Sequence, residues 1–577
     1  MATFDYDVIV VGSGFGGSVM TYRLAEAGLK VCLLERGQAW PPGSFPRSPL
    51  RMSKNFWNPD KRLHGMFNIW SFKRIGGVVS SGLGGGSLIY ANVLYRKPAE
   101  TFKPEGWPIS YDDLAPHYDA AEAMLNGQSY PFQEDPADRT DDHAPYNTTP
   151  KTRAMQIAAE QLAKHDPTVD FQLPKLAVTF ANPNEPPKLG EPIRCAPPSL
   201  HERGRTRLTC QLCGECDIGC NYGSKNTLDL TYLSAAMQLD QKPCIKTNAE
   251  VKTFEPYNDG YRVHYVDHSA AVKGDAAAPQ SSGLKPVPLT SRFLVLAAGS
   301  FGSTYLMLKN ADNFPGLNRE ALGTKFCGNG DLLTVLVRSK EQQEKGAQPR
   351  VLDSGYGPVI TSAIRFKDMD DGALRGYYYI EDAGYPEFAN WLIESANPVP
   401  LIRRGLGFAR MWLSLRLGFA DDSDIGAKVS WLLGDCELSS TSMPLLGMGR
   451  DTADGTMRLT KKGRLAIDWD MQSSASYFGK VRKSARGIAK ALHANFAENP
   501  LTYLSRVITV HPLGGCPMGK DKTEGVVDTW GEVYGHKGFY IADGSVIPGP
   551  IGPNPSLTIA ACAGRFAGHL IEAARGQ

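Results

Sequence analysis

The chain has 577 residues, too many for one hydrophobic core, so at least two domains are expected. Its 62 Lys and Arg residues against 60 Asp and Glu give a net charge of +2, which excludes the basic field of a nucleic-acid-binding protein. No apolar run is long enough for a transmembrane helix, and the first residues lack a signal-peptide pattern. With eleven cysteines, an odd number, we expect a cytoplasmic protein without a disulfide framework.

The N-terminal segment has the pattern strand, glycine-rich turn, helix, strand. Tyr6–Val11 is apolar enough for a buried strand, and the turn GSGFGG follows. The glycines of G-x-G-x-x-G allow a tight bend, close approach to a pyrophosphate and close packing of helix on sheet. A pyrophosphate would lie on the helix N-terminus, and a carboxylate ending the second strand would bind the ribose hydroxyls. The pattern predicts a dinucleotide site, without separating NAD from FAD, at Gly12, Gly14, Phe15, Gly16, Gly17 and Glu35.

Three later segments continue this pattern along the chain. Five glycines lie between Gly77 and Gly86, which suits a backbone lying flat against a large planar ligand. Phe293–Leu308 reads as a buried strand that enters a glycine turn and a helix. Near the end, GFYIADGS predicts a strand that ends at Asp543, and a helix is predicted from Asn554 and Pro555.

The stretches VGSGFGG, GLGGGSLIYANV, GSKNTLDLTYL, LAAGSFGS, HPLGGC and ADGSVIPGPIGPNPSLTI resemble the glucose–methanol–choline (GMC) flavoprotein oxidoreductases, in their cholesterol oxidase-like branch. The resemblance implies FAD and an α/β fold. A Rossmann-like FAD-binding domain would be assembled from residues 1–100, 205–330 and 500–577. A substrate domain built on an antiparallel sheet would be interleaved as residues 101–204 and 331–499.

The resemblance also implies which residues contact FAD. The isoalloxazine would lie along Gly84–Asn92, the ribityl–pyrophosphate at Asp543, and the adenine at the backbone of Val251. Tyr90-Ala91-Asn92 departs from the Asn-Gly of many relatives, so contacts at the flavin edge are expected to differ. The implied contacts are Gly84, Gly85, Gly86, Ser87, Tyr90, Ala91, Asn92, Val251, Ala298, Gly299, Asp543, Gly544, Asn554 and Pro555.

Two polar residues near the C-terminus are implied as the catalytic pair, His511 and Asn554. A neutral imidazole can accept or orient a substrate hydroxyl proton while the carbinol hydride leaves, and an asparagine amide can hold the substrate oxygen. The alternatives are a core histidine before a proline turn and an asparagine that caps a helix. Steroid-specific relatives add a glutamate over the substrate. Glu437 is the candidate here, with a surface carboxylate as its alternative.

Four cysteines lie in the cysteine-rich loop 209–227, with the spacing C-x₂-C-x₂-C-x₃-C: Cys210, Cys213, Cys216 and Cys220. This spacing is that of bacterial ferredoxins, and it predicts an iron–sulfur cluster as an electron exit from the flavin. Zinc, redox disulfides and packed thiols stay open as alternatives.

One further segment, Val399–Phe419, mixes arginines with large apolar residues at helical spacing and has no acidic residue. It indicates either a helix lying on an anionic membrane, which would make the protein peripheral, or an amphipathic lid packed on the core.

The sequence thus predicts an FAD-dependent oxidoreductase acting on a bulky hydrophobic alcohol, with oxygen or a one-electron acceptor. A non-redox flavin lyase or isomerase and a non-catalytic electron-transfer or lipid-carrier protein remain as alternatives.

Overall fold

The computed structural model describes residues 3–47, 54–103, 105–132, 145–194, 196–201, 204–275, 279–343, 346–368, 376–385, 437–499 and 506–576. The segment Val399–Phe419 lies outside these ranges, so the structure does not test its two interpretations. Within the described ranges, no helix combines the length and the apolar character that a bilayer span needs.

One seven-stranded sheet carries the N-terminal glycine turn. Its strands run in the order β11-β2-β1-β14-β13-β12, and β25 also pairs with β14. The strands from β11 to β14 and β25 are parallel, whereas β12 and β13 are antiparallel to their neighbours. The sheet therefore joins strands from the beginning, middle and end of the chain. Their bounds are β1 (Tyr6–Val11), β2 (Val31–Leu34), β11 (Cys244–Lys246), β12 (Ala249–Tyr257), β13 (Gly260–Asp267), β14 (Val287–Leu296) and β25 (Phe539–Ile541).

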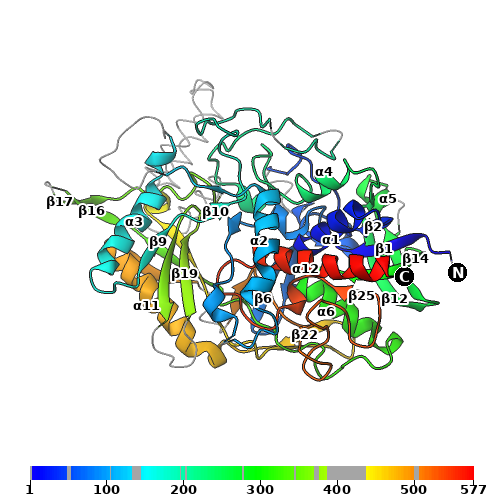
Figure 1. Cartoon of the computed structure of the whole chain (residues 1–577). Helices are drawn as coiled ribbons and strands as arrows, with labels where there is room; N and C mark the ends of the chain where they lie inside the picture. Colours follow the sequence, from blue (N-terminus) through cyan, green and yellow to red (C-terminus); the bar gives the residue numbers. More distant parts are fainter. Residues whose placement is uncertain are drawn as a thin grey trace, which may run out of the picture.

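Helices α1, α12 and α2 pack against one another beside this sheet, and both chain ends lie at this end of the molecule (Figure 1). The hydroxyls of Tyr118 on α2 and Thr558 on α12 are hydrogen-bonded at 2.9 Å. Although α2 falls in the segment predicted for the substrate domain, its apolar side chains join the core of the nucleotide-binding sheet. The helices in this part are α1 (Phe15–Glu26), α2 (Tyr111–Leu125), α4 (Tyr232–Ala236), α5 (Ser269–Val272), α6 (Gly299–Asn310) and α12 (Ser556–Arg575).

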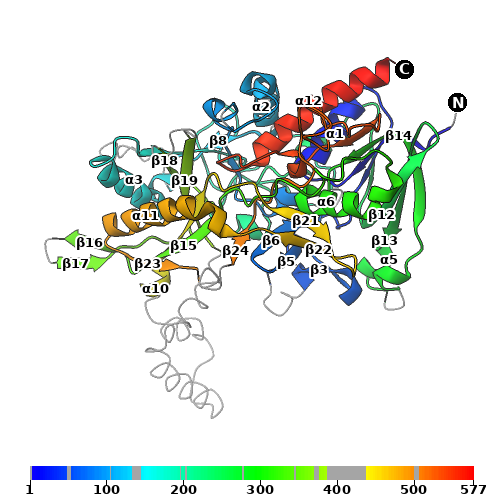
Figure 2. The ribbon, with the colours of Figure 1, turned by 90° about the horizontal axis from the view of Figure 1, so that it is seen from below.

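A second sheet of six antiparallel strands lies at the other end, in the order β23-β15-β20-β19-β18-β9, with α3 and α11 packed beside it (Figures 1 and 2). All six strands come from the segments predicted for the substrate domain, while the domain boundaries remain a prediction. The elements are β9 (Asp170–Gln172), β15 (Leu332–Val337), β18 (Ala363–Asp368), β19 (Gly376–Asp382), β20 (Met443–Met448), β23 (Asn495–Glu498), α3 (Pro150–Ala163), α10 (Glu437–Ser440) and α11 (Ala475–Ala491).

A three-stranded sheet, β24-β6-β5, joins the two parts. Strand β24 pairs in parallel with β6, Thr509 opposite Gly77, so the segments that leave these two strands start at the same edge. One leads to His511 and the other to the glycines at 82–86, which brings the predicted catalytic and flavin segments together. These strands are β5 (Phe67–Ser71), β6 (Ile75–Ser80) and β24 (Val507–Thr509). The remaining short strands are β3 (Trp57–Asn58), β4 (Leu63–His64), β7 (Val93–Leu94), β8 (Gln128–Ser129), β10 (Lys175–Leu176), β16 (Lys340–Gln343), β17 (Gly346–Pro349), β21 (Thr456–Leu459) and β22 (Leu465–Asp468).

Candidate active site

The turn between β1 and α1 requires its glycines for packing. A Cβ on Gly16 would lie 1.4 Å from the carbonyl oxygen of Ala542, and one on Gly17 would lie 1.9 Å from that of Gly12. Gly12 itself has a left-handed φ of +97°. A Cβ on Gly14, in contrast, would meet nothing within 4 Å. Gly14 precedes the first turn of α1 and leaves room for a ligand at the helix N-terminus, where the helix dipole favours an anion.

Glu35 lies directly beside this turn. Its Oε2 accepts hydrogen bonds from the backbone N–H (3.0 Å) and hydroxyl (2.7 Å) of Ser13, and its Oε1 accepts one from Gly37 (2.8 Å). Burial raises the pKa of Glu35, and these donors oppose that shift. Oε2 already accepts two hydrogen bonds, whereas Oε1 accepts one and retains acceptor capacity for a ribose hydroxyl. The start of β12 is joined to the same place, since Ala249 N–H donates to the carbonyl of Glu35, and this brings Val251 to the end of the predicted nucleotide site.

The segment Gly84–Asn92 lies on the nucleotide turn. A Cβ on Gly85 would be 2.5 Å from the Cα of Gly14, whereas one on Gly86 would meet nothing within 4 Å. The Tyr90 ring lies edge-on to that of Phe15, with centroids 5.3 Å apart. Asn92 is fully buried with a left-handed φ of +73°, and neither of its amide atoms has a hydrogen-bond partner among the described residues. An open glycine floor with an unpartnered buried amide is what a planar, polar-edged ring such as flavin would occupy.

The C-terminal turn closes the site from the other side. Asp543 accepts hydrogen bonds from the backbone N–H groups of Gly299 and Ser545, each at 2.8 Å, and so joins the end of β25 to the start of α6. The hydroxyl of Ser300 donates to the carbonyl of Pro512 at 2.6 Å. Gly544 in turn accepts a hydrogen bond from Gly514 N–H. The predicted contacts Ala298, Gly299, Asp543 and Gly544 are thus continuous with the His511 segment.

His511 is held by a carboxylate that the sequence did not reveal. Its Nδ1 lies 2.8 Å from Oδ1 of Asp331, which is buried on the loop before β15. An acidic acceptor at Nδ1 keeps the proton on that nitrogen and leaves Nε2 as the basic atom. No described residue makes a hydrogen bond to Nε2. With its side chain 14% exposed, His511 can meet a ligand through this atom.

Asn554 and Glu381 form the other polar part of the site. Asn554 is buried at the start of α12, and its Oδ1 has no hydrogen-bond partner among the described residues. Glu381 on β19 is completely buried, with both carboxyl oxygens also unpartnered. Burial raises the pKa of Glu381 well above its usual value, and the side chain of Asn554 offsets part of this shift. Burial therefore favours the neutral form of the Glu381 carboxyl, and only the neutral form can donate a hydrogen bond.

Glu381 is the glutamate whose carboxyl interacts with the side chain of Asn554, and the role of Glu437 stays a prediction. Glu437 begins α10, but its side chain lies outside what the structure describes. The stretch YYYIED around Glu381 reads as an ordinary strand, because nothing in its alternation indicates that this carboxyl faces the core. The signal that could have found Asp331 is the turn FCGNGD, in which Asn-Gly predicts a left-handed bend just before an acidic residue.

The cysteine loop packs tightly against its surroundings. A Cβ on Gly219 would meet the Phe45 ring at 2.1 Å, and one on Gly214 would meet the carbonyl of Gly355 at 2.3 Å. Lys225, at the end of the loop, donates from Nζ to the carbonyls of Cys216 (2.6 Å), Tyr90 (2.7 Å) and Leu88 (3.1 Å). The loop therefore supports the flavin segment mechanically.

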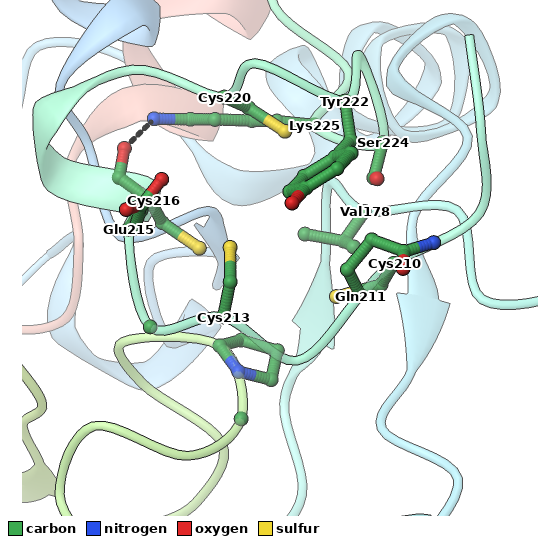
Figure 3. A pocket seen from close by; sticks show the side chains of 13 residues that line it. Val178, Cys210, Gln211, Cys213, Glu215, Cys216, Cys220, Tyr222, Ser224 and Lys225 are labelled. Carbon is green, nitrogen blue, oxygen red and sulfur yellow. Dashed lines mark hydrogen bonds between the residues drawn. The ribbon is translucent and has the colours of Figure 1, made fainter. Parts of the chain in front are cut away.

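The four thiols do not form a cluster site in this arrangement. In Figure 3 the sulfurs of Cys213 and Cys216 point toward one another, while that of Cys210 lies on the far side of the pocket. Among the described residues, no three His, Cys, Asp or Glu side chains are grouped to hold a metal ion. The space between the loop side chains has about 20 Å³ for water, room for only one or two molecules. The hypothesis of an iron–sulfur cluster at Cys210, Cys213, Cys216 and Cys220 therefore does not fit the described residues.

Burial raises the pKa values of three cysteines of this loop. Burial raises the pKa of Cys213 to about 12 and that of Cys210 well above its usual value. Burial also raises the pKa of Cys216, and the charge of Lys225 opposes this shift.

We expect anaerobically purified protein to contain FAD but neither iron nor acid-labile sulfide. Cys216→Ser should retain the flavin spectrum, because the residue's contact with Lys225 is made by its backbone carbonyl. Elemental analysis and visible absorbance check both points, with Cys562→Ser, a buried cysteine on α12, as the matched control. If stoichiometric iron and sulfide are found in wild type and are lost in Cys216→Ser but not in Cys562→Ser, the iron–sulfur hypothesis would be supported again.

Comparison with known proteins agrees with this geometry. Residues 451–563 match the GMC oxidoreductase family, in the part that contains His511 and Asn554, and residues 10–41 match the NAD(P)-binding Rossmann-like domain. A cholesterol oxidase from Mycobacterium tuberculosis is 29% identical over 98% of this chain and 90% of its own length. The chain belongs to the GMC oxidoreductase family. Within it, the chain falls in the cholesterol oxidase-like branch.

Other members of the GMC family are more distant. A long-chain-alcohol oxidase from Arabidopsis thaliana is 22% identical over 99% of this chain and 68% of its own length. The solved structure of a fungal aryl-alcohol oxidase has the same fold, with a TM-score of 0.55 and 12% identity over the full length of both chains. As a GMC oxidoreductase, the protein is an FAD-dependent enzyme acting on alcohols, and the predicted α/β fold is confirmed.

Proposed function

We propose that the enzyme oxidises a bulky hydrophobic alcohol, a sterol or a long-chain alcohol, with His511 and Asn554 as its catalytic residues and oxygen as electron acceptor. The observation that carries the proposal is the His511–Asp331 pair, whose contact of 2.8 Å leaves Nε2 free beside the flavin segment. The hydrophobic substrate class is supported by the relatives, a cholesterol oxidase and a long-chain-alcohol oxidase.

Each polar group has a role in this chemistry. FAD, when bound, supplies the acceptor for the carbinol hydride. His511 accepts the hydroxyl proton at Nε2 as the hydride leaves, and the resulting imidazolium is stabilised by the carboxylate of Asp331. Asn554 donates a hydrogen bond from its amide to the substrate oxygen. Glu381, which is completely buried and interacts with the side chain of Asn554, orients the amide. We prefer Glu381 to Glu437 for this position.

Anaerobic mixing tests the proposal. Purified enzyme should lose its oxidised flavin absorbance when a sterol or a long-chain alcohol is added, whereas a short polar alcohol should reduce it far more slowly. Admission of air should restore the absorbance and produce hydrogen peroxide. Reduction by no alcohol at all would contradict the proposal and favour a non-redox lyase, an isomerase or a carrier. If the reduced flavin is stable in air, oxygen is not the electron acceptor, and a one-electron acceptor takes its place in the proposal.

Membrane contact by Val399–Phe419 is a second part of the proposal. The hydrophobic alcohol on which the enzyme acts would partition into bilayers. The protein should cosediment with anionic vesicles, and salt should weaken this binding. Replacing Arg403, Arg404, Arg410 and Arg416 with serine should weaken it at least about 100-fold, because each arginine near the surface contributes about 1 kcal/mol. The exposed basic turn Lys461, Lys462 and Arg464 is the matched control. Equal loss in both variants, or no binding by wild type, would favour a packed lid.

A further inference from the structure

One short loop, Gly328–Asp331, contacts the segments that carry both catalytic residues. It lies between Cys327 and β15. The backbone N–H of Cys327 donates to the carbonyl of Leu513, and the N–H of Leu513 donates to the carbonyl of Cys327, each at 3.1 Å. Asn329 and Gly330 have left-handed φ values of +54° and +71°. The hydroxyl of Tyr477 donates to the carbonyl of Gly330 at 2.9 Å and would lie 2.4 Å from a Cβ at this position. The loop is therefore held in one conformation by its own backbone and by its packing.

Asp331 holds the His511 segment with both carboxylate oxygens. Oδ1 faces Nδ1 of His511, while Oδ2 accepts from the backbone N–H groups of Val510 (2.9 Å) and His511 (3.2 Å). Oδ2 also accepts from the hydroxyl of Thr509 at 2.9 Å. The side chain is 1% exposed. These donors fix the carboxylate, and the carboxylate in turn fixes the plane and the tautomer of the imidazole.

Asn329 holds the segment before Asn554. Its Oδ1 accepts from the backbone N–H groups of Ile551 (2.8 Å) and Gly552 (3.2 Å), and its Nδ2 donates to the carbonyl of Pro553 (2.9 Å). Asn329 is completely buried. Its amide thus acts on three consecutive residues of the backbone that leads into Asn554.

We propose that Asn329 and Asp331 are positioning residues that set the relative placement of Asn554 and His511 from one rigid loop. The inference rests on the proposed function, in which these two side chains meet the same substrate oxygen. A carboxylate and an amide two residues apart on a fixed backbone hold both groups at once, so neither can shift without straining the loop. Displacement of such a group by about 1 Å can cost about 10²-fold in rate.

Asp331→Asn tests the first contact without changing shape. The backbone N–H groups of Val510 and His511 require an acceptor, so the amide oxygen takes the place of Oδ2 and the NH₂ group faces Nδ1 of His511. The imidazole must then carry its proton on Nε2, where it cannot accept the substrate proton. We expect the limiting rate of flavin reduction by alcohol to fall at least tenfold. Substrate affinity, FAD content and reduction by dithionite should stay near wild type.

Background variants separate positioning from a structural role. In His511→Ala, the change Asp331→Asn should cost no further rate, because Asp331 acts through the imidazole. Likewise Asn329→Gly should slow reduction at least tenfold in wild type and have no further effect in Asn554→Ala.

Asp451→Asn is the control for Asp331→Asn. Asp451 lies outside the loop Gly328–Asp331, and its carboxyl accepts a hydrogen bond at 2.8 Å from the backbone N–H of Gly328. Burial raises the pKa of Asp451 to about 7. Asn184→Gly, an exposed left-handed asparagine, is the control for Asn329→Gly.

The outcomes distinguish this inference from the proposed function. Wild-type rates in Asp331→Asn and Asn329→Gly, with slow reduction in His511→Ala, would overturn the inference and leave the function standing. Wild-type rates in His511→Ala would exclude His511 as the proton acceptor and would overturn the inference with it, whereas a flavin that no alcohol reduces would overturn the function itself. Additive losses in the background variants, equal losses in Asp451→Asn, or variants that purify without FAD would show that the loop serves folding and would also overturn the inference.

Discussion

His511→Ala is expected to reduce the rate of flavin reduction by alcohol roughly 10²–10⁴-fold, while FAD stays bound. Nε2 of this imidazole makes no hydrogen bond to a described residue, and its Nδ1 is held 2.8 Å from a buried carboxylate. Without it the substrate hydroxyl must lose its proton to water, in a site where Asp331 is occupied by backbone donors. FAD content should not change, because His511 is not among the predicted FAD contacts.

Stopped-flow absorbance under anaerobic conditions measures this effect, with reduction by dithionite as the internal reference. His569→Ala, on α12, is the matched control. That imidazole also makes a hydrogen bond through Nδ1, at 3.0 Å from the hydroxyl of Tyr540 on β25. It should keep wild-type reduction rates. A His511→Ala enzyme that alcohol reduces as fast as wild type would exclude His511 as the proton acceptor.

Gly16→Ala is expected to destabilise the apoprotein, whereas Gly14→Ala is expected to leave its stability unchanged. A methyl group on Gly16 would overlap the carbonyl of Ala542 at 1.4 Å, and backbone cannot move aside as a side chain can. We expect a loss of about 4 kcal/mol or more in the free energy of unfolding, and little soluble holoenzyme. A methyl group on Gly14 meets no protein atom, so the apoprotein should keep its stability and lose affinity for FAD.

Thermal unfolding of the two apoproteins, followed by FAD titration, measures both effects. Added FAD should raise the Tm of wild type by mass action and should raise that of Gly14→Ala much less. Gly479→Ala, in helix α11 with nothing within 4 Å of the added methyl group, controls for a glycine change distant from the ligand. Equal apoprotein stability in Gly14→Ala and Gly16→Ala would contradict the packing of the glycine turn against Ala542.

The parts of the site that could be predicted from sequence are those with local requirements. The glycine turn is one of them, because contacts inside a single strand–turn–helix unit determine the spacing of its glycines. His511 and Asn554 were placed by a resemblance in the motifs around them. Asp331 and Asn329 could not be placed, since their partners lie 180 and 222 residues away in the chain. Only the fold determines such pairs.

The cysteine loop shows the opposite limit of sequence reasoning. Its spacing is that of a cluster-binding motif, yet Gly214 and Gly219 serve contacts with Gly355 and Phe45, and Lys225 turns the loop toward the flavin segment. Four thiols at such a spacing have the same sequence whether or not their sulfurs converge. Glu381 is a similar case, because the burial of a carboxyl on β19 depends on what covers the strand.

The contact of Gly16 with Ala542 has a consequence for biosynthesis. The nucleotide turn is made in the first seventeen residues, but the strand that closes it, β25, is among the last parts to leave the ribosome. A nascent chain therefore holds the first half of its cofactor site unfinished during almost the whole of translation. We expect FAD to find its full site only once β25 has been made, so the cellular yield of active enzyme should depend on chaperones and on free FAD at that stage.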